Sequence, residues 1–222
     1  MKEVKASTVL WAAALLLAPV IHAGVIYNNG APAATDNNFG NEMTHWIEAD
    51  NFSLAATDTI RGVEFWELNR EDLPGDYNGS IDWFIYSDNS GSPGTVLASG
   101  NVAPTRTATG VVLQSVFTEF DMKFSIPDFV ATGGTTYWLG LHNGSTATDT
   151  TNEQFFWEVG NAGVPPANHD FPLDTPGATW SESFNEFAFN LSNTAFVTAT
   201  PEPGTILLLG CGLAAFAIRR KR

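Results

Sequence analysis

Three histidines in the middle of the chain, His45, His142 and His169, have side chains that could ligate a metal ion or accept a proton. Each stands alone in the sequence, next to residues typical of turns or strand ends, and no His-Glu-x-x-His pattern occurs. The sequence also lacks the Gly-x-Ser-x-Gly pattern of a nucleophile elbow and a glycine-rich phosphate loop. These residues therefore do not predict metal-assisted hydrolysis, serine hydrolysis or phosphate transfer.

Two pairs of acids have the residue type that glycoside hydrolysis requires. They are Glu64 with Glu67 and Glu119 with Asp121. Strands of a β-sandwich routinely expose acids on their solvent face, so we expect no catalytic residues and no enzyme activity. A secreted hydrolase is kept as the second alternative.

Three oxygen-rich stretches have the side chains that Ca²⁺ prefers: Asp36-Asn37-Asn38, Asp72 to Asn78, and Asp88 to Ser90. No Asp-x-Asp-x-Asp-Gly loop is present. Asp and Asn also favour turns, because their side chains bond the neighbouring backbone. We expect no cofactor, and structural calcium is kept as an alternative.

The tryptophans indicate a possible carbohydrate-binding surface. Aromatic rings stack on sugar rings while nearby Asp and Asn bond the hydroxyls. Trp83 and Trp138 lie within predicted strands and are expected to be buried. Trp46, Trp157 and Trp180 lie nearer loops and are the candidate sugar-binding residues. A module that binds exopolysaccharide is therefore the first alternative function.

The C-terminal tail has three parts in a fixed order. Pro201, Glu202 and Pro203 form a polar box whose prolines keep the backbone extended and accessible to a processing enzyme. An uncharged apolar run from Thr205 to Ile218 follows, and the chain then ends in a basic cluster, Arg219-Arg220-Lys221-Arg222. The run suits lipid, and the cluster suits the anionic cytoplasmic face of a membrane, which leaves the rest of the chain outside.

These residues resemble the PEP-CTERM sorting signal of bacterial surface proteins, which an exosortase processes. The resemblance implies that Pro201, Glu202 and Pro203 are the recognition residues and that Arg219, Arg220, Lys221 and Arg222 retain the tail in the membrane. Thr200 departs from the small aliphatic residue that often precedes the first proline. The same tail also occurs on some ice-binding proteins. A plain membrane anchor is the other interpretation, but the run spans only roughly 21 Å against a hydrocarbon core of roughly 30 Å.

The first 23 residues are typical of a secretory signal peptide. Lys2 and Lys5 precede the apolar stretch Val9 to Val20, and Ala23 offers a signal-peptidase site before Gly24. We therefore expect export, an intermediate held in the inner membrane, and final delivery to the cell surface or extracellular matrix of a bacterium.

The exported part is strongly acidic. Once both terminal signals are set aside, 4 basic and 22 acidic residues remain, a net charge near −18. Nucleic acid is excluded as a partner, because phosphate binding needs a basic surface. The one cysteine, Cys211, lies in the tail, so the exported part has no disulfide and no thiol chemistry.

The alternation of side chains predicts an all-β fold. In Glu119 to Ile126 the residues Phe120, Met122, Phe124 and Ile126 share one face. Ten or eleven such strands are expected at Val25–Tyr27, Asn51–Leu54, Thr59–Leu68 (with a bulge at Gly62), Ile81–Tyr86, Val96–Ser99, Gly110–Phe117, Glu119–Ile126, Thr135–His142, Gln154–Val159, Glu186–Leu191 and Ala195–Ala199. Two stretches, Asn143 to Asn152 and Gly160 to Trp180, are expected to be long loops.

These strands and their Gly/Pro turns predict one antiparallel β-sandwich, jelly-roll-like, over residues 24–198. A signal helix (1–23) and a C-terminal hydrophobic helix within the tail (199–222) flank it. Ala49 to Leu54, Ser92 to Ala98 and Gly134 to Leu139 look similar to ectodomains often attached to PEP-CTERM tails. The function expected from the sequence is a non-enzymatic cell-surface or extracellular-matrix protein.

Overall fold

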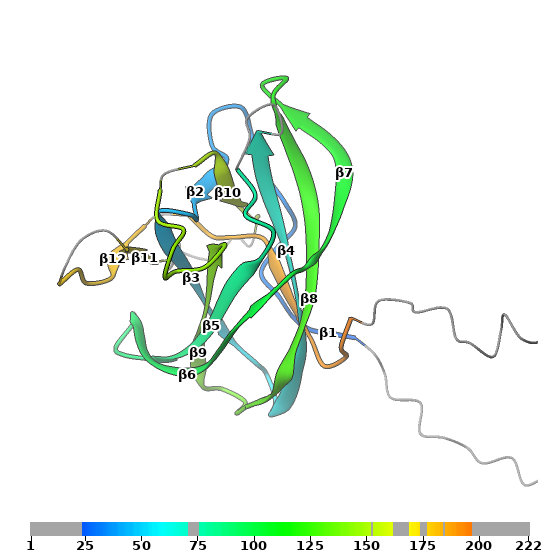
Figure 1. The fold of residues 1–222 in the computed structure, drawn as a ribbon. Helices are drawn as coiled ribbons and strands as arrows, with labels where there is room; N and C mark the ends of the chain where they lie inside the picture. The colour runs from blue at the N-terminus through cyan, green and yellow to red at the C-terminus, as the bar shows by residue number, and fades with distance from the viewer. Residues whose placement is uncertain are drawn as a thin grey trace, which may run out of the picture.

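The computed structural model describes residues 24–70, 76–151, 153–161, 169–173, 177–183 and 185–196. The predicted signal peptide and its helix (1–23) and the sorting tail with its predicted hydrophobic helix (199–222) lie outside these residues. The part of the chain that the structure describes holds strands, turns and bends and no helix (Figure 1). Accordingly, no helix within these residues has the length and apolar character needed to cross a membrane.

Two antiparallel sheets, one of seven and one of six strands, make up the described chain. Their strands are β1 (Val25–Asn28), β2 (Gly40–Glu42), β3 (Trp46–Ser53), β4 (Asp58–Arg70), β5 (Ile81–Asp88), β6 (Pro93–Val102), β7 (Thr105–Leu113), β8 (Phe117–Ala131), β9 (Thr136–Asn143), β10 (Phe155–Glu158), β11 (His169–Pro172), β12 (Ser181–Glu182) and β13 (Phe189–Ser192). The all-β, two-sheet prediction is confirmed, and the jelly-roll-like connectivity stays a prediction.

The seven-stranded sheet is organised around β4. One edge of β4 pairs with β8 along its length, and its other edge pairs first with β13 and then with β10. β7 extends this sheet beyond β8, while β1 and β2 extend it beyond β13 and β10. The six-stranded sheet has the order β12-β11-β3-β9-β5-β6. In chain order, successive strands change sheet at β2/β3, β3/β4, β4/β5, β6/β7, β8/β9, β9/β10, β10/β11 and β12/β13.

The core lies between the two sheets. Phe120, Met122, Phe124 and Ile126 of β8 are all buried there, as their alternation predicts. Inward residues of β3, β5 and β9 from the other sheet, such as Phe52, Trp83 and Leu139, belong to the same cluster. Trp83 and Trp138 are buried, which confirms that pair of predictions.

The bulge expected at Gly62 is present, since the pairing of β4 with β8 shifts register between Ile60 and Gly62. The strand expected over Gly110–Phe117 is right for Gly110 to Leu113, which belong to β7, and wrong beyond them. β7 ends at Leu113, the chain turns, and β8 begins at Phe117. Gln114 and Ser115 form this turn with φ of 47° and 62°. The turn contains no Gly, Pro, Asn or Asp, and a single Ser is a weak turn signal, so the hairpin was missed.

Three short strands were also missed. β2 is polar throughout, β11 falls within the stretch expected to be the loop Gly160 to Trp180, and β12 follows directly after that stretch. They form because their backbones pair with longer neighbours: β2 with β10, and β11 with β3. Of the strand expected over Ala195–Ala199, the first two residues are described and are not in a strand; the rest lies outside the described residues.

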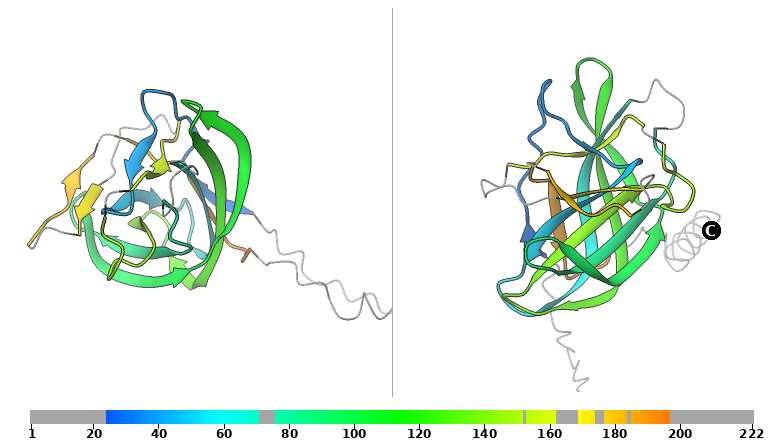
Figure 2. Two further views of the ribbon diagram at one scale, coloured as in Figure 1. Left: turned by 45° about the horizontal axis from the view of Figure 1, so that its top comes forward. Right: turned by 90° about the vertical axis from the view of Figure 1, so that its left-hand side faces the viewer.

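The two ends of the described chain lie side by side. β1 pairs with β13, and Asn193 donates its backbone N–H to the carbonyl of Gly24 at 3.3 Å. In both Figure 1 and the left view of Figure 2, β1 lies on one side of the molecule, and β11 and β12 lie on the opposite side. The described chain therefore begins and ends at one common end of the ectodomain, where the predicted signal peptide precedes it and the sorting tail follows it.

Candidate functional site

The three candidate sugar-binding tryptophans lie in three different environments. Trp157 is wholly buried in the core, so its assignment as an exposed sugar-binding residue is wrong. It lies on β10, whose inner face meets Phe187 and Phe65. Trp46 and Trp180 are half-buried and line two separate cavities. The structure therefore does not gather the three into one surface.

Trp180 belongs to an aromatic cluster on the outer face of the six-stranded sheet. Its ring meets the edge of Tyr86 at 5.4 Å between centroids, and Phe171 lies 5.3 Å from Trp180. Phe84 stacks on Tyr86 at 5.6 Å. Gly140 on the adjacent strand makes room for this packing, because a Cβ there would lie 2.6 Å from the Tyr86 ring. The cluster is thus built on the sheet itself.

A cavity of about 660 Å³, which we name the Trp180 cleft, lies beside this cluster. Trp180 and Phe171 line it together with the turn that joins β5 to β6. Asp88 in that turn accepts hydrogen bonds from Nε1 of Trp138 at 2.9 Å and from the backbone N–H of Gly91 at 3.1 Å. The cleft therefore combines aromatic walls with a fixed polar turn.

Several polar side chains of the cleft have no hydrogen-bond partner among the described residues. The amide of Asn89 and the hydroxyls of Ser92, Thr95 and Thr179 belong to this group. Thr95 does donate its backbone N–H to the hydroxyl of Ser87 at 3.0 Å, which fixes one side of the turn. These groups are available to bond the hydroxyls of a ligand.

The oxygen-rich stretch Asp88 to Ser90, expected as a possible calcium loop, is this turn. Ser90 and Gly91 have φ of 57° and 88°, which shows a tight turn. The Asp88 carboxylate bonds protein N–H groups instead of forming an acidic group with others. Within the described residues no cluster of three or more His, Cys, Asp or Glu could hold a metal ion. Structural calcium stays an untested alternative, and residues 71–75 lie outside the described chain.

The three histidines do not form a site together. Nε2 of His142 lies 2.7 Å from the Thr44 carbonyl, and burial lowers the pKa of His142. Nδ1 of His45 lies 3.0 Å from the carbonyl of Thr150. The ring of His169 packs edge-on against Trp138 at 4.8 Å. Each ring thus has its own structural surroundings.

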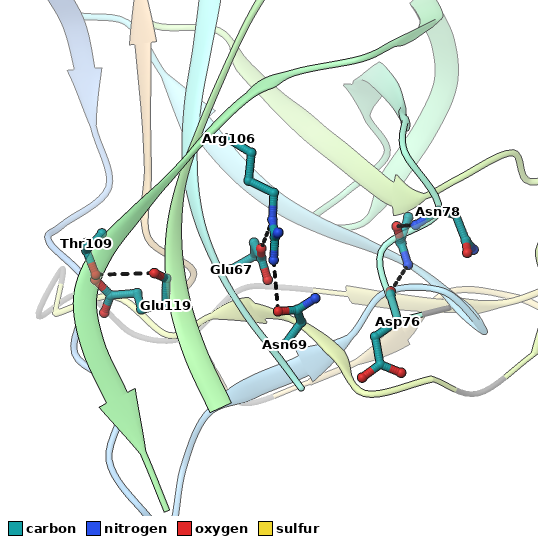
Figure 3. Close-up of polar contacts among 8 residues, drawn as sticks. Glu67, Asn69, Asp76, Asn78, Arg106, Thr109 and Glu119 are labelled. Atoms are coloured by element: carbon teal, nitrogen blue, oxygen red, sulfur yellow. Dashed lines mark hydrogen bonds and ion pairs between the residues drawn. The ribbon is translucent and has the colours of Figure 1, made fainter. Parts of the chain in front are cut away.

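The two acid pairs are separated by strand geometry. Glu64 lies on the outer face of β4 and pairs with Lys123 at 2.7 Å. Glu67 is buried, and its carboxylate bonds Nε of Arg106 at 2.8 Å (Figure 3). Of the second pair, Asp121 bonds the Lys123 ammonium, whereas Glu119 lies beside Glu158. Neither pair brings two free carboxyls to a shared cleft.

Sequence reasoning missed another arrangement, in which acids from separate strands meet in pairs. Glu48 faces Asp170 across β3 and β11, and Nδ2 of Asn41 lies between them, 3.0 and 2.9 Å from their carboxylate oxygens. The pKa of Glu48 is raised well above its usual range, mainly by burial and secondly by the neighbouring Asp170. Both acids line a cavity of about 250 Å³ beside Trp46.

Asp50 and Glu158 have similar surroundings. Nδ2 of Asn29 donates to Asp50 at 2.9 Å and to Glu186 at 3.1 Å. The pKa of Asp50 is raised well above its usual range, mainly by burial and secondly by the charge of Glu186. The pKa of Glu158 is raised from 4.5 to about 8, mainly by burial and secondly by the charge of Glu119. The partners are far apart in the sequence, so only the fold reveals them.

These raised pKa values predict that the protein is more stable in acid than in base. The folded state keeps protons on Glu48, Asp50 and Glu158 that the unfolded chain releases above its ordinary carboxyl pKa. The free energy of unfolding therefore falls as the pH rises from about 5 to the folded pKa of Glu158, about 8. We expect the Tm to drop by at least about 5 °C between pH 5 and pH 8.5 in thermal scans.

The control for this prediction separates paired acids from general charge repulsion. Glu158→Gln keeps the side-chain shape but cannot ionise, so it should flatten the pH profile. Glu182→Gln, at an exposed position in β12, should leave the slope of the profile as it is. A Tm that rises with pH, or equal slopes in both variants, would contradict the role assigned to Glu158.

The ectodomain thus belongs to the class of all-β, two-sheet domains, with an aromatic cleft on one outer face. The comparison with known proteins finds a match in the C-terminal tail. The family model for the PEP-CTERM protein-sorting motif matches residues 199–222, which confirms the resemblance seen in the sequence. The motif indicates a protein that is exported, sorted through the membrane and processed by an exosortase. No curated protein matches the chain.

Proposed function

We propose that this chain is a non-enzymatic component of the bacterial cell surface or extracellular matrix. The observation that carries the proposal is the PEP-CTERM motif at residues 199–222. The predicted signal peptide, the acidic exported part and the lack of cysteine in that part support the same role. Its partners in this role are signal peptidase, which removes residues 1–23, and an exosortase-like enzyme, which acts on the tail.

The tail performs the sorting in three steps. The apolar run holds the exported chain in the inner membrane, and Arg219, Arg220, Lys221 and Arg222 keep its end on the cytoplasmic side. Pro201, Glu202 and Pro203 then present an extended, accessible box to the enzyme, because proline cannot join a helix interior. Processing at the box releases the ectodomain to the surface or matrix.

The shape of the ectodomain supports this role. Its first and last described strands pair, so both terminal signals attach at one end. β11 and the β5–β6 turn, which contribute residues to the lining of the Trp180 cleft, lie on the side of the molecule away from β1 (Figure 1). A chain held by its tail would therefore present the cleft outward.

The sorting proposal is tested by the intact mass of the protein recovered from the surface or medium of its own host. The wild-type chain should lack residues 1–23 and everything after about Pro203. A Glu202→Ala variant should keep its tail and remain in the membrane fraction, because the recognition box has lost its one charge. A Glu182→Ala variant carries the same change at an exposed site of β12 and should be processed like the wild type.

If the wild-type protein retains Arg222 and stays in the membrane, the tail is an ordinary anchor and the matrix role fails. If Glu202→Ala is processed normally, the box is not the recognition element.

Carbohydrate binding is the second candidate function, and the Trp180 cleft is the observation that favours it. A half-buried tryptophan, a second aromatic ring and unpartnered hydroxyl and amide groups line one cavity. Small-molecule sites typically combine apolar walls with a few placed polar groups in this way. The saccharide would be an exopolysaccharide of the surface to which the protein is delivered.

A secreted hydrolase receives less support. Glu48 and Asp170 are paired acids that line a common cavity, and the amide of Asn41 fills the space between their carboxyls. A retaining glycosidase needs its carboxyls about 5 Å apart with the sugar between them. We therefore place binding before hydrolysis.

A further inference from the structure

We propose that the Trp180 cleft binds an uncharged saccharide and discriminates against uronate-bearing or sulfated ones. This inference rests on the carbohydrate-binding function proposed above, and it specifies the ligand class. It follows from three features of the cleft: the presentation of its aromatic rings, its free hydrogen-bonding groups, and the distribution of charge over the two sheets.

The aromatic rings form a rigid wall suited to a sugar ring. Trp180 is half-buried, so part of its indole stays open to the cleft while the rest packs against Tyr86 and Phe171. Tyr86 is itself buried on the outer face of the sheet. A pyranose has one apolar C–H face and a rim of hydroxyls, and an anchored indole offers a matching apolar surface at little entropic cost.

The size and rim of the cleft fit the hydroxyls of such a ring. Its volume of about 660 Å³ can hold a short oligosaccharide segment. The free side chains of Asn89, Thr95 and Thr179 supply both donors and acceptors, which a row of sugar hydroxyls needs. None of these three groups carries a charge, so they select for hydroxyls and not for ionic groups.

The charge pattern excludes an anionic ligand. Between Gly24 and Thr200 the sequence has four basic residues, and Arg61, Arg70, Arg106 and Lys123 all lie on strands β4, β7 and β8 of the seven-stranded sheet. The strands of the six-stranded sheet carry acids but no lysine or arginine. Of the described residues that line the cleft, Asp88 alone has a charged side chain. A uronate or sulfate would thus meet repulsion with no compensating cation.

The experiment measures binding of the full-length chain to immobilised hexasaccharides in three classes. The neutral class holds cello-, malto-, manno-, galacto- and xylo-oligosaccharides. The cationic class holds glucosamine oligomers, and the anionic class holds guluronate and sulfated galactose oligomers. We expect binding within the neutral class and at least about tenfold weaker binding of the anionic class at low salt, where charge effects are largest.

Two tryptophan variants locate the binding site. Trp180→Ala should weaken neutral binding by about tenfold or more, and Trp180→Phe, which keeps an aromatic face, should recover much of it. Trp46→Ala is the matched control, because Trp46 is also half-buried but lines a different cavity. Thermal scans check that each variant folds. Equal binding by all three variants would overturn the assignment to this cleft.

The outcomes separate the ligand class from the function on which it rests. If no class binds, carbohydrate binding itself fails. If the anionic class binds best and Trp180→Ala abolishes it, carbohydrate binding stands and the uncharged class is wrong. A Ser90→Lys variant provides a positive test, because Ser90 is exposed in the β5–β6 turn and is not one of the residues that line the cleft. A cation introduced there should raise anionic binding at least about fivefold and leave neutral binding within about twofold. An unchanged anionic response would show that charge does not set the specificity.

Discussion

Replacing Trp157 with alanine is expected to lower the free energy of unfolding by about 3–5 kcal/mol. The Trp157 side chain is fully buried, and its ring stacks on Phe187 at 4.6 Å with an interplanar angle of 16°. Phe65 and Phe189 meet the ring edge-on at 6.1 and 5.7 Å. Truncation would leave a large cavity at the centre of this aromatic group.

The lost hydrogen bond adds to the lost packing. Nε1 of Trp157 donates to the carbonyl of Ala188 at 3.1 Å inside the core. Ala188 precedes β13, and its N–H is bonded to the carbonyl of Glu158. Removing the indole leaves a buried acceptor with one partner fewer, which costs about 1 kcal/mol. The site lies where β10 and β13 meet along the edge of β4, so both strands are expected to loosen.

Urea unfolding followed by circular dichroism measures this effect. Trp46→Ala serves as control, because its half-buried ring should cost less than about 1.5 kcal/mol. A Trp157→Ala variant as stable as Trp46→Ala would show that the core packing around β10 is not as described. The comparison also decides between the two interpretations of Trp157, since a surface sugar-binding residue would be lost without a stability cost.

The sequence predicts strands well where one face of the strand meets the core and the other meets water. β8 and β5 show this alternation, and their buried residues match the expected ones. Prediction from alternation fails for Glu48 and Asp50 of β3, because both are acids on the inner side of a strand. Periodicity assigns acids to solvent, and only the neighbouring strands with Asp170 and Glu186 explain their burial.

The Trp180 cleft shows the same limit on prediction. Trp180 and the Asp88 turn were both singled out in the sequence, but for different functions. Their proximity depends on β11 pairing with β3, and β11 lies in a stretch that has no strand signal. Phe171 was not predicted at all for the same reason. Single residues of a site can thus be predicted from composition and spacing, whereas their grouping depends on pairing between distant segments.

Arg106→Met is expected to lower the free energy of unfolding by about 3–5 kcal/mol, because it leaves Glu67 as a buried acid without its cation. Arg106 lies on β7 and turns inward, and its Nε is 2.8 Å from the carboxylate of Glu67, whose side chain is 0% exposed. Another guanidinium nitrogen donates to Asn69 at 2.8 Å (Figure 3). The guanidinium also lies over the rings of Tyr77 and Phe120.

A double-mutant cycle tests whether the loss of stability arises from the Glu67 carboxylate that has lost its cation. Glu67→Gln removes the charge, and the double variant with Arg106→Met leaves neither ion in the core. We expect the double variant to be more stable than Arg106→Met alone by at least about 1.5 kcal/mol, because the desolvation cost of the unpaired carboxylate disappears. Additive losses in the two single variants would contradict this account.

Arg61→Met provides the matched comparison, because Arg61 also forms an ion pair from a strand of the same sheet. It bonds Asp128 at 2.9 Å, but the two side chains are 37% and 64% exposed. Water screens that pair, so we expect its loss to cost less than about 1 kcal/mol. The two ion pairs have similar N–O distances and differ in how far their side chains are buried. If both truncations cost the same, burial does not determine the value of these ion pairs, and the inward position of Arg106 would have to be reconsidered.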